Sequence, residues 1–338
     1  MWKTLGHDKA VSSLTRAVGE GRIAHAYIIV GPPSVGKMVL AMDMARALNC
    51  DQDAPPCGAC KQCTRITNAL HPDVRVVERE LDDRGRRRTV IRIEQVREIQ
   101  REASLKPYEG ASRVYIFDGA DSFQEAGANS LLKTLEEPPD QVVLILLASS
   151  AEAIMPTILS RCRRIDLRPV APKLIAEHLT QHHGSDPEKA DEIARLSAGQ
   201  IGWAIRAVDE PELLERIGQQ TDAIEQAVQS GLESRLEYAA QLATRFTRDR
   251  TDAFAELGLW LGWWRDVMMI SEKTPQLVRN TSRMAALQAV ADRLDERRVA
   301  DVVRAVGRTI ELLERNVNPR LAIEELMLAI PMPQPARQ

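Results

Sequence analysis

The chain has 338 residues, which at about 150 residues per domain predicts two or three domains. Hydrophobic residues make up 44% of it and charged residues 28%, a composition that excludes disordered and collagen-like chains. The 45 basic and 48 acidic residues leave a formal net charge of -3, so no general positive field draws the chain onto nucleic acid or an anionic membrane.

No segment predicts a membrane span or a secretion signal. The longest apolar run, Val142 to Ala148, has seven residues, whereas a spanning helix needs roughly 18 to 20. The N-terminus, Met1 to Thr4, has no apolar stretch behind it that could serve as a signal peptide. We therefore expect a cytoplasmic protein without a membrane partner.

The first 167 residues alternate short apolar runs with helical patterns. Ala26 to Val30 predicts a strand that stops at Gly31, and Val39 to Leu48 predicts the helix that follows. Further strands are predicted at Val74 to Val77, Val90 to Ile93, Val114 to Phe117, Val142 to Ala148 and Arg164 to Leu167. This alternation predicts an α/β fold with a mostly parallel sheet flanked by helices on both faces.

Two helices are predicted between these strands. One runs from Ile93 to Ala103. The other ends at Glu137, before two prolines, and Ser122 with Glu125 forms a predicted capping box at its start.

Beyond Pro169 the strand-like runs disappear and helical spacing takes over, as in Leu174, Ile175 and His178. Pro211 marks a further boundary before longer helices, which include Ala255 to Ile270 and Ala300 to Leu313. We therefore predict three domains: an α/β base domain at 1–167, a small helical domain at 168–208 and an all-α domain at 209–338.

Four of the five cysteines crowd into fourteen residues, at Cys50, Cys57, Cys60 and Cys63. A C-x2-C-x2-C core on a loop interrupted by proline and glycine can fold four thiolates around one tetrahedral zinc ion. Since sulfur would fill all four positions, such a site is structural and leaves no position for catalysis. Free thiols and a redox pair of Cys57 with Cys60 are the alternatives.

A phosphate-binding loop is predicted where the first strand passes into its helix. Its candidate contacts with a nucleotide are Gly31, Ser34, Val35, Gly36 and Lys37. Backbone N–H groups and a helix N-terminus favour phosphate there, and Lys37 can reach the outer phosphates. The next position normally holds a Ser or Thr that binds magnesium, but here it is Met38, a poor ligand for that hard cation.

The acidic partner of this loop is predicted to be Asp118, which ends a buried strand and could hold magnesium indirectly. Gly119 stands where ATPases of this type usually carry the Glu that positions water, and Asp121 is interpreted as a helix cap. Nucleotide binding is therefore expected to be weak or absent. The alternative is that both motifs are ordinary turns.

A family resemblance rests on motifs spread over the first domain. They are Gly6 to Lys9, Arg22 to Tyr27, the four-cysteine group, His71 to Asp73, Ala128 to Pro139 and Ser160 to Cys162, with looser matches at Leu196 to Gly199 and Asn316 to Arg320. With the phosphate loop they resemble the AAA+ clamp-loader subunits of bacterial DNA polymerase III.

The resemblance implies an AAA+ base domain at 1–167 with a zinc module inserted at 50–63, a helical lid at 168–208 and a helical collar at 209–338 that assembles a five-subunit ring. In that ring Arg161 would act as an arginine finger on ATP bound by a neighbouring gamma/tau subunit. The alternative is that Arg161 pairs with a local carboxylate. Cys162 is then a small buried apolar neighbour.

Within the family, the sequence resembles an ATPase-deficient stator more than a motor. Gly202 stands where active members carry an arginine that senses nucleotide, so it is the third missing part after Met38 and Gly119. A gamma/tau-like motor, which should carry Thr, Glu and Arg at these positions, is the enzyme alternative. The implied partners are gamma/tau and delta subunits of the polymerase holoenzyme, with the sliding clamp and primed DNA reached through the ring.

A zinc-dependent nucleic-acid-binding protein that works without a ring is a third hypothesis, and the net charge of -3 argues against it. Arg84 to Arg88 carries four arginines, but the acidic residues before them favour a solvated loop over a DNA contact. Trp260, Trp263 and Trp264 share one helix face, for which packing is favoured over base stacking. Lys133 is interpreted as a surface charge.

Overall fold

We analyse a computed structural model of the chain that describes residues 1–80 and 90–332. The loop predicted at Arg84 to Arg88, with its alternative of a DNA contact, lies outside the described residues. The chain divides into two units, one of residues 1–178 and 197–204, the other of residues 179–196 and 205 onward. Residues 168–208, predicted as a lid domain, are shared between these units, and the three-domain division stays a prediction.

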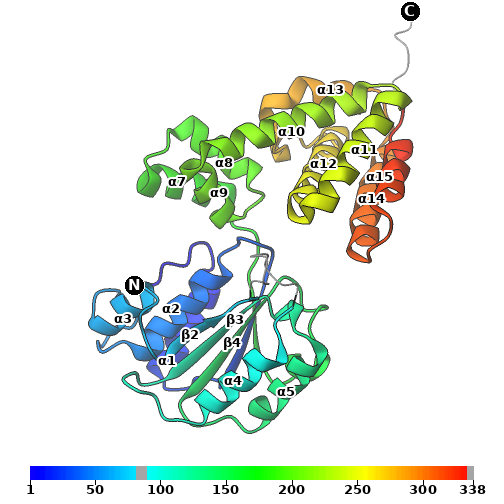
Figure 1. Cartoon of the computed structure of the whole chain (residues 1–338). Helices are drawn as coiled ribbons and strands as arrows, with labels where there is room; N and C mark the ends of the chain where they lie inside the picture. The colour runs from blue at the N-terminus through cyan, green and yellow to red at the C-terminus, as the bar shows by residue number, and fades with distance from the viewer. Residues whose placement is uncertain (81–89, 333–338) are drawn as a thin grey trace, which may run out of the picture. The chain divides into compact units, whose positions relative to one another are not determined.

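A five-stranded parallel sheet forms the centre of the first unit, with strand order β2-β3-β4-β1-β5 (Figure 1). Its strands are β1 (Ala26–Val30), β2 (Val74–Val77), β3 (Arg113–Asp118), β4 (Val142–Ala148) and β5 (Arg163–Asp166). Along β1 and β4 the register runs from Ala26 opposite Leu144 to Val30 opposite Ala148. The predicted parallel sheet is thereby confirmed.

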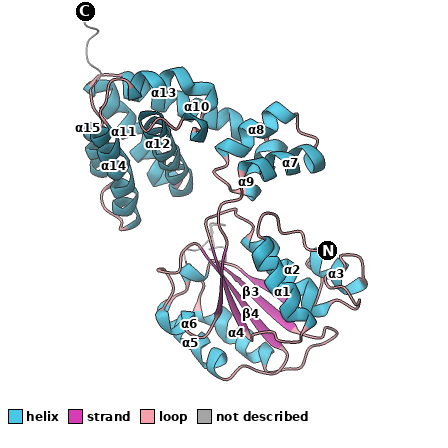
Figure 2. Cartoon of the chain, turned by 180° about the vertical axis from the view of Figure 1, so that it is seen from behind, coloured by secondary structure: helices cyan, strands magenta, loops and turns pink. Residues whose placement is uncertain are grey.

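Helices cover both faces of this sheet, as Figure 2 shows from behind. They are α1 (Asp8–Gly19), α2 (Lys37–Asn49), α3 (Lys61–Thr67), α4 (Ile93–Ala103), α5 (Glu125–Glu136) and α6 (Pro156–Leu159). Successive side chains of a strand point to opposite faces. Tyr27 and Ile29 therefore join the core with α1, α2 and α3, while Ile28 and Val30 join the core with α4, α5 and α6.

Two local predictions are wrong. The predicted strand Val90 to Ile93 reduces to one isolated bridge between Ile91 and Phe123, because helix α4 begins at Ile93. The Gln95 side chain accepts the Arg92 N–H at 3.1 Å and so fixes that helix start.

The predicted capping box of Ser122 and Glu125 is also absent. Ser122 instead ends a short 3-10 helix, η1 (Ala120–Ser122), and its hydroxyl donates to the Gly119 carbonyl at 2.6 Å. Helix α5 starts after Gln124, which makes no side-chain cap.

The rest of the chain is helical, as predicted. Its elements are α7 (Pro172–His183), α8 (Pro187–Leu196), α9 (Ile201–Asp209), α10 (Pro211–Gln229), α11 (Leu232–Arg248), α12 (Arg250–Ser271), η2 (Pro275–Leu277), η3 (Thr281–Arg283), α13 (Met284–Ala291), α14 (Glu296–Glu314) and α15 (Pro319–Ala329). Trp260, Trp263 and Trp264 of α12 are at most 1% exposed and lie in the core of the second unit. Their interpretation as packing residues is confirmed. Among the described residues, no helix is long and apolar enough to span a bilayer.

A buried arginine ties the ends of this helical unit together. Arg235 is fully buried and donates to the carbonyls of Ala227 and Val228, at the end of α10, at 3.0 and 2.9 Å. It also donates to the carbonyls of Ile330 and Pro331, just after α15, at 2.6 and 3.0 Å. Carbonyls at a helix end have no partner within the helix, so one guanidinium satisfies two helix termini that lie far apart in sequence.

Asp73 is a second buried polar residue that joins separate segments of the chain. It precedes β2, at the end of the sheet where the parallel strands begin. Its side chain is 1% exposed, and it accepts three backbone N–H groups of residues 108–110 at 2.7 to 2.9 Å. Arg113 donates to the same carboxylate at 3.2 Å. Burial raises the pKa of Asp73, but these hydrogen bonds and the Arg113 charge outweigh burial and hold the pKa below its usual value.

Replacing Asp73 with Asn should lower the free energy of unfolding by about 2 kcal/mol near neutral pH, because buried N–H groups lose a charged acceptor. The lowered pKa means that the native state binds fewer protons, so this stabilisation is present above the unfolded pKa of about 3.9 and is lost as pH falls through the folded pKa. Denaturant titrations at several pH values should show that the difference in the free energy of unfolding between wild type and Asp73→Asn becomes smaller below about pH 4. An undiminished difference at low pH contradicts this account, and the exposed Asp140→Asn is the control.

Candidate functional site

The predicted phosphate loop lies between the end of β1 and the start of α2. Its backbone needs glycine at two places. Gly36 has a φ of 109°, in the left-handed region. At Gly31, a Cβ atom would lie 2.6 Å from the Leu167 carbonyl oxygen, so a side chain there would collide with the chain leaving β5.

Lys37 is turned into this loop. Its ammonium donates to the carbonyls of Gly31 at 2.6 Å and Pro32 at 2.8 Å. Burial lowers the pKa of Lys37, while the charges of Asp121 and Asp118 act in the opposite direction. The next side chain, Met38, packs against the hydrophobic core between the sheet and α2. The loop thus has a cation, but position 38 offers no hydroxyl that could bind magnesium.

The acidic partner of the loop has its predicted position at the end of β3, where Asp118 pairs in register with Leu147 of the central strand β4. Gly119 follows with a φ of 85°. Asp121 was interpreted as a helix cap, and that is wrong: its carboxylate accepts the N–H of Ser149 at 3.0 Å and also the Ser149 hydroxyl. Asp121 therefore ties η1 to the end of β4.

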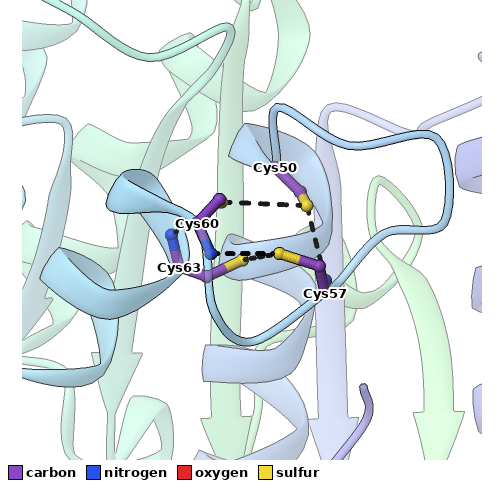
Figure 3. A group of neighbouring side chains, drawn as sticks. All are labelled: Cys50, Cys57, Cys60 and Cys63. Carbon is purple, nitrogen blue, oxygen red and sulfur yellow. Dashed lines mark hydrogen bonds between the residues drawn. The ribbon is translucent and has the colours of Figure 1, made fainter.

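The four cysteines converge on one point beside α2 and α3 (Figure 3). All four Sγ atoms lie within 4.8 Å of one another. The Cys50 and Cys60 sulfurs are 4.0 Å apart, and those of Cys57 and Cys63 are 3.9 Å apart. Zinc–sulfur bonds of about 2.3 Å place tetrahedral sulfur ligands about 3.8 Å from each other. The geometry fits one zinc ion, which would hold the loop between α2 and α3.

Backbone N–H groups point at these sulfurs, as they do where thiolates are stabilised. Cys60 and Ala59 donate to the Cys57 sulfur at 3.2 and 3.4 Å and lower the pKa of Cys57 to about 6. Burial raises the pKa of Cys63 to about 12. A metal ion binds the deprotonated sulfur, so binding at Cys63 must release a proton.

The cysteine module is joined to the sheet domain through α2. Cys63 is fully buried and its sulfur lies 3.9 Å from the Arg46 carbonyl. The Arg46 guanidinium reaches the Thr67 hydroxyl at 3.1 Å and also pairs with buried Asp43. Asp43 in turn accepts from the N–H groups of residues 3 and 4 at 2.8 and 2.9 Å. The module therefore stabilises the packing of the N-terminal segment as well as its own loop.

Arg161 follows α6 and is partly exposed, with 36% of its side chain accessible. Its guanidinium donates to Glu136 at 2.7 Å, the Thr157 carbonyl at 3.0 Å and the Ser160 hydroxyl at 3.2 Å. The alternative of a local carboxylate partner is therefore real in the isolated chain. Next to it, Cys162 is partly buried against the hydrophobic core, and burial raises its pKa to about 12.

Comparison with known proteins identifies relatives of the first domain. Residues 6–171 match the family model described as DNA polymerase III, delta subunit. DNA polymerase III subunit delta' of Bacillus subtilis is 29% identical over 211 residues, which cover 62% of this chain and 60% of that protein. DNA polymerase III subunit gamma/tau of Mycobacterium tuberculosis H37Rv is 34% identical over 173 residues, covering 51% of this chain and 29% of that protein.

Among solved structures, the Thermotoga maritima RuvB Holliday junction branch migration motor aligns with a TM-score of 0.42 and 16% identity over 64% of each chain. The chain spans less than two thirds of the length of both polymerase relatives. Over residues 6–171 the chain belongs to the AAA+ family of DNA polymerase III clamp-loader subunits.

Several contacts at these sites could not be read from residue spacing. The sequence indicated the loop, the acidic strand end and the four thiols, and the structure brings the four thiols together at one point. It did not indicate that Glu136 would meet Arg161, or that Asp121 would bind Ser149. The His71 to Asp73 motif was the one signal for the Asp73 network, but only as part of a family resemblance.

The purified chain should contain one zinc ion, measured by elemental analysis after anaerobic purification. Cys63→Ser should lose the metal and lower the free energy of unfolding by at least about 2 kcal/mol, because a buried ligand is lost. Cys162→Ser should keep the metal, since this sulfur lies outside the cluster. A wild-type chain without zinc, or a Cys63→Ser chain that retains it, contradicts the assignment.

Proposed function

We propose that this clamp-loader family member is the delta prime subunit, an ATPase-deficient stator that helps to place the sliding clamp on primed DNA. The observation that carries the proposal is the backbone at positions 119 and 202. Gly119 has a φ of 85°, where a glutamate would be strained. At Gly202 a Cβ atom would lie 3.2 Å from the Ser34 carbonyl oxygen, so any side chain there would displace Ser34 by a few tenths of an ångström.

These two positions support the stator for a physical reason. A motor that had merely exchanged side chains would keep a backbone able to accept Glu and Arg again. Here the main chain at Gly119 has a conformation that favours glycine, a Cβ atom at position 202 would crowd Ser34, and Met38 packs against the core. Restoring the three missing groups would therefore strain the backbone at position 119 and displace Ser34. Nucleotide at the loop around Lys37 is proposed to bind weakly or not at all.

The subunit would act on its neighbour through Arg161. In the isolated chain this side chain is held mainly by Glu136, which is itself 54% exposed. Exposed ion pairs contribute about 0–1 kcal/mol, so the guanidinium can exchange Glu136 for a phosphate at little cost. We propose that it does so on ATP bound by a gamma/tau subunit, as an arginine finger supplied in trans.

The assembly follows from the same family membership. The helical domain predicted at residues 209–338 would serve as the collar through which the subunit joins gamma/tau and delta subunits in a ring. The sliding clamp and primed DNA would be met through that ring, consistent with a chain whose own net charge is -3. The alternative is a gamma/tau-like motor, favoured by the 34% identity to the mycobacterial gamma/tau subunit.

Arg161→Ala should lower ATP hydrolysis by a ring assembled with gamma/tau and delta subunits, in the presence of clamp and primed DNA. At the single ATP site that Arg161 serves, the hydrolysis rate should fall on the order of 10³-fold or more. Total hydrolysis by the ring should therefore fall by the part which that site contributes. Arg164→Ala, which removes a similarly exposed arginine paired with Asp166, should leave hydrolysis unchanged. Equal activity of the Arg161→Ala and wild-type rings contradicts the finger assignment.

The purified chain alone should hydrolyse no ATP above the background of a Lys37→Ala chain. The missing hydroxyl at position 38 and the missing carboxylate at position 119 are the physical reason, because neither magnesium nor the attacking water is held. Steady hydrolysis that depends on Lys37 would instead establish the motor alternative.

A further inference from the structure

The segment from Ser197 to Ala204 lies directly on the phosphate loop. The Gly202 N–H donates to the Ser34 carbonyl at 2.8 Å. One residue earlier, a methyl carbon of Ile201 lies 4.0 Å from the place that a Cβ atom on Gly36 would occupy. The backbone of this segment and the backbone of the loop are therefore in hydrogen-bonding contact.

The same segment is anchored at a second point. The Val170 N–H donates to the Gly199 carbonyl at 2.9 Å. Gly199 has a φ of 84°, and a Cβ atom there would lie 2.5 Å from Pro169, so only glycine allows this approach. Two backbone hydrogen bonds on either side of a helix start thus hold the segment to the first unit.

The Gly202 N–H is a donor that its own helix cannot satisfy. Helix α9 begins at Ile201, and the N–H groups of a first helical turn have no acceptor within the helix. The acceptor is supplied by Ser34, which has a φ of 55°. That left-handed conformation is unfavourable for a residue other than glycine or asparagine.

Any side chain at position 202 would disturb this contact. A Cβ atom would lie 3.2 Å from the Ser34 oxygen and 3.5 Å from the Ser34 Cβ. The loop or the segment would then have to move by a few tenths of an ångström for alanine, and by more for a longer residue. Glycine at position 202 therefore does more than omit an arginine, because it lets the segment approach Ser34 without crowding it.

We propose that the Gly202–Ser34 contact is an intramolecular latch that fixes residues 197–204 on the phosphate loop without help from a nucleotide. It gives a residue-level basis to the proposed stator and rests on that proposed function for its biological role. A backbone hydrogen bond joins loop and segment directly, so the position of the segment is independent of ATP.

Hydrogen–deuterium exchange of the full chain, read by mass spectrometry on peptides covering 197–204, tests the latch. Gly202→Pro deletes the N–H donor at a helix start, where proline is tolerated. We expect the exchange rate in these peptides to rise by about tenfold or more, because local opening no longer has to break the hydrogen bond between residue 202 and Ser34. Glu212→Pro, at the equivalent second position of α10, is the matched control and should leave these peptides unchanged.

A second variant guards against misfolding of the first. Gly202→Arg should raise exchange in the same peptides by crowding Ser34, whereas Gly218→Arg, where nothing lies within 4 Å of an added Cβ, should not. Adding ADP to the wild-type chain should give residues 197–204 no further protection. Unprotected peptides in the wild type, variants that exchange like their controls, or strong protection by ADP would each overturn the latch.

These outcomes are separate from those of the proposed function. The exchange experiment uses the isolated chain, whereas the finger is tested by ATP hydrolysis in the assembled ring. If residues 197–204 are protected from exchange but Arg161→Ala does not change ATP hydrolysis by the ring, the stator proposal is wrong and the latch is supported. An Arg161-dependent ring whose subunit has an unprotected segment overturns the latch alone.

Discussion

Close approach of backbone to backbone around the phosphate loop is the constraint on which the rest of this structure depends. Gly31 lies against the chain leaving β5, Gly36 takes a left-handed conformation, and Gly202 meets Ser34 through a hydrogen bond of 2.8 Å. A loop of this shape normally directs its N–H groups at phosphate. In this chain the lysine that would meet phosphate donates to the carbonyls of its own loop. The architecture of a nucleotide site is retained, while its lysine is satisfied from within the protein.

Buried polar networks stabilise the opposite end of the sheet and the cysteine module. Asp73 gathers three backbone N–H groups and an arginine, and the cysteine module is tied through Arg46 and Asp43 to the N-terminal segment. In each network a buried carboxylate accepts several hydrogen bonds, and removing such an acceptor would leave buried donors without a partner. Together they suit a subunit whose proposed role is to hold its shape while its neighbours change theirs.

The sequence predicted the parallel sheet well, because β1 and β4 are continuous apolar runs bounded by loops and buried on both faces. It failed at Val90 to Ile93, where apolar residues suited a strand but Gln95 capped a helix, and at Ser122, whose hydroxyl turned back to Gly119. Both failures are competitions between local hydrogen bonds that spacing does not resolve. The four thiols were predictable because they are close in sequence. The pairs Gly202 with Ser34 and Arg161 with Glu136 were not, because each depends on how separate elements pack.

The most direct test of the central claim is an experimental structure of the ring assembled from this chain with gamma/tau and delta subunits, bound to an ATP analogue. The distances from Arg161 to Glu136 and to the nearest phosphate are the measurement. We expect the guanidinium within hydrogen-bond distance of a phosphate on the neighbouring subunit, with the Gly202–Ser34 hydrogen bond intact and no nucleotide on Lys37. Nucleotide seated on Lys37, with Arg161 still on Glu136, would contradict the account.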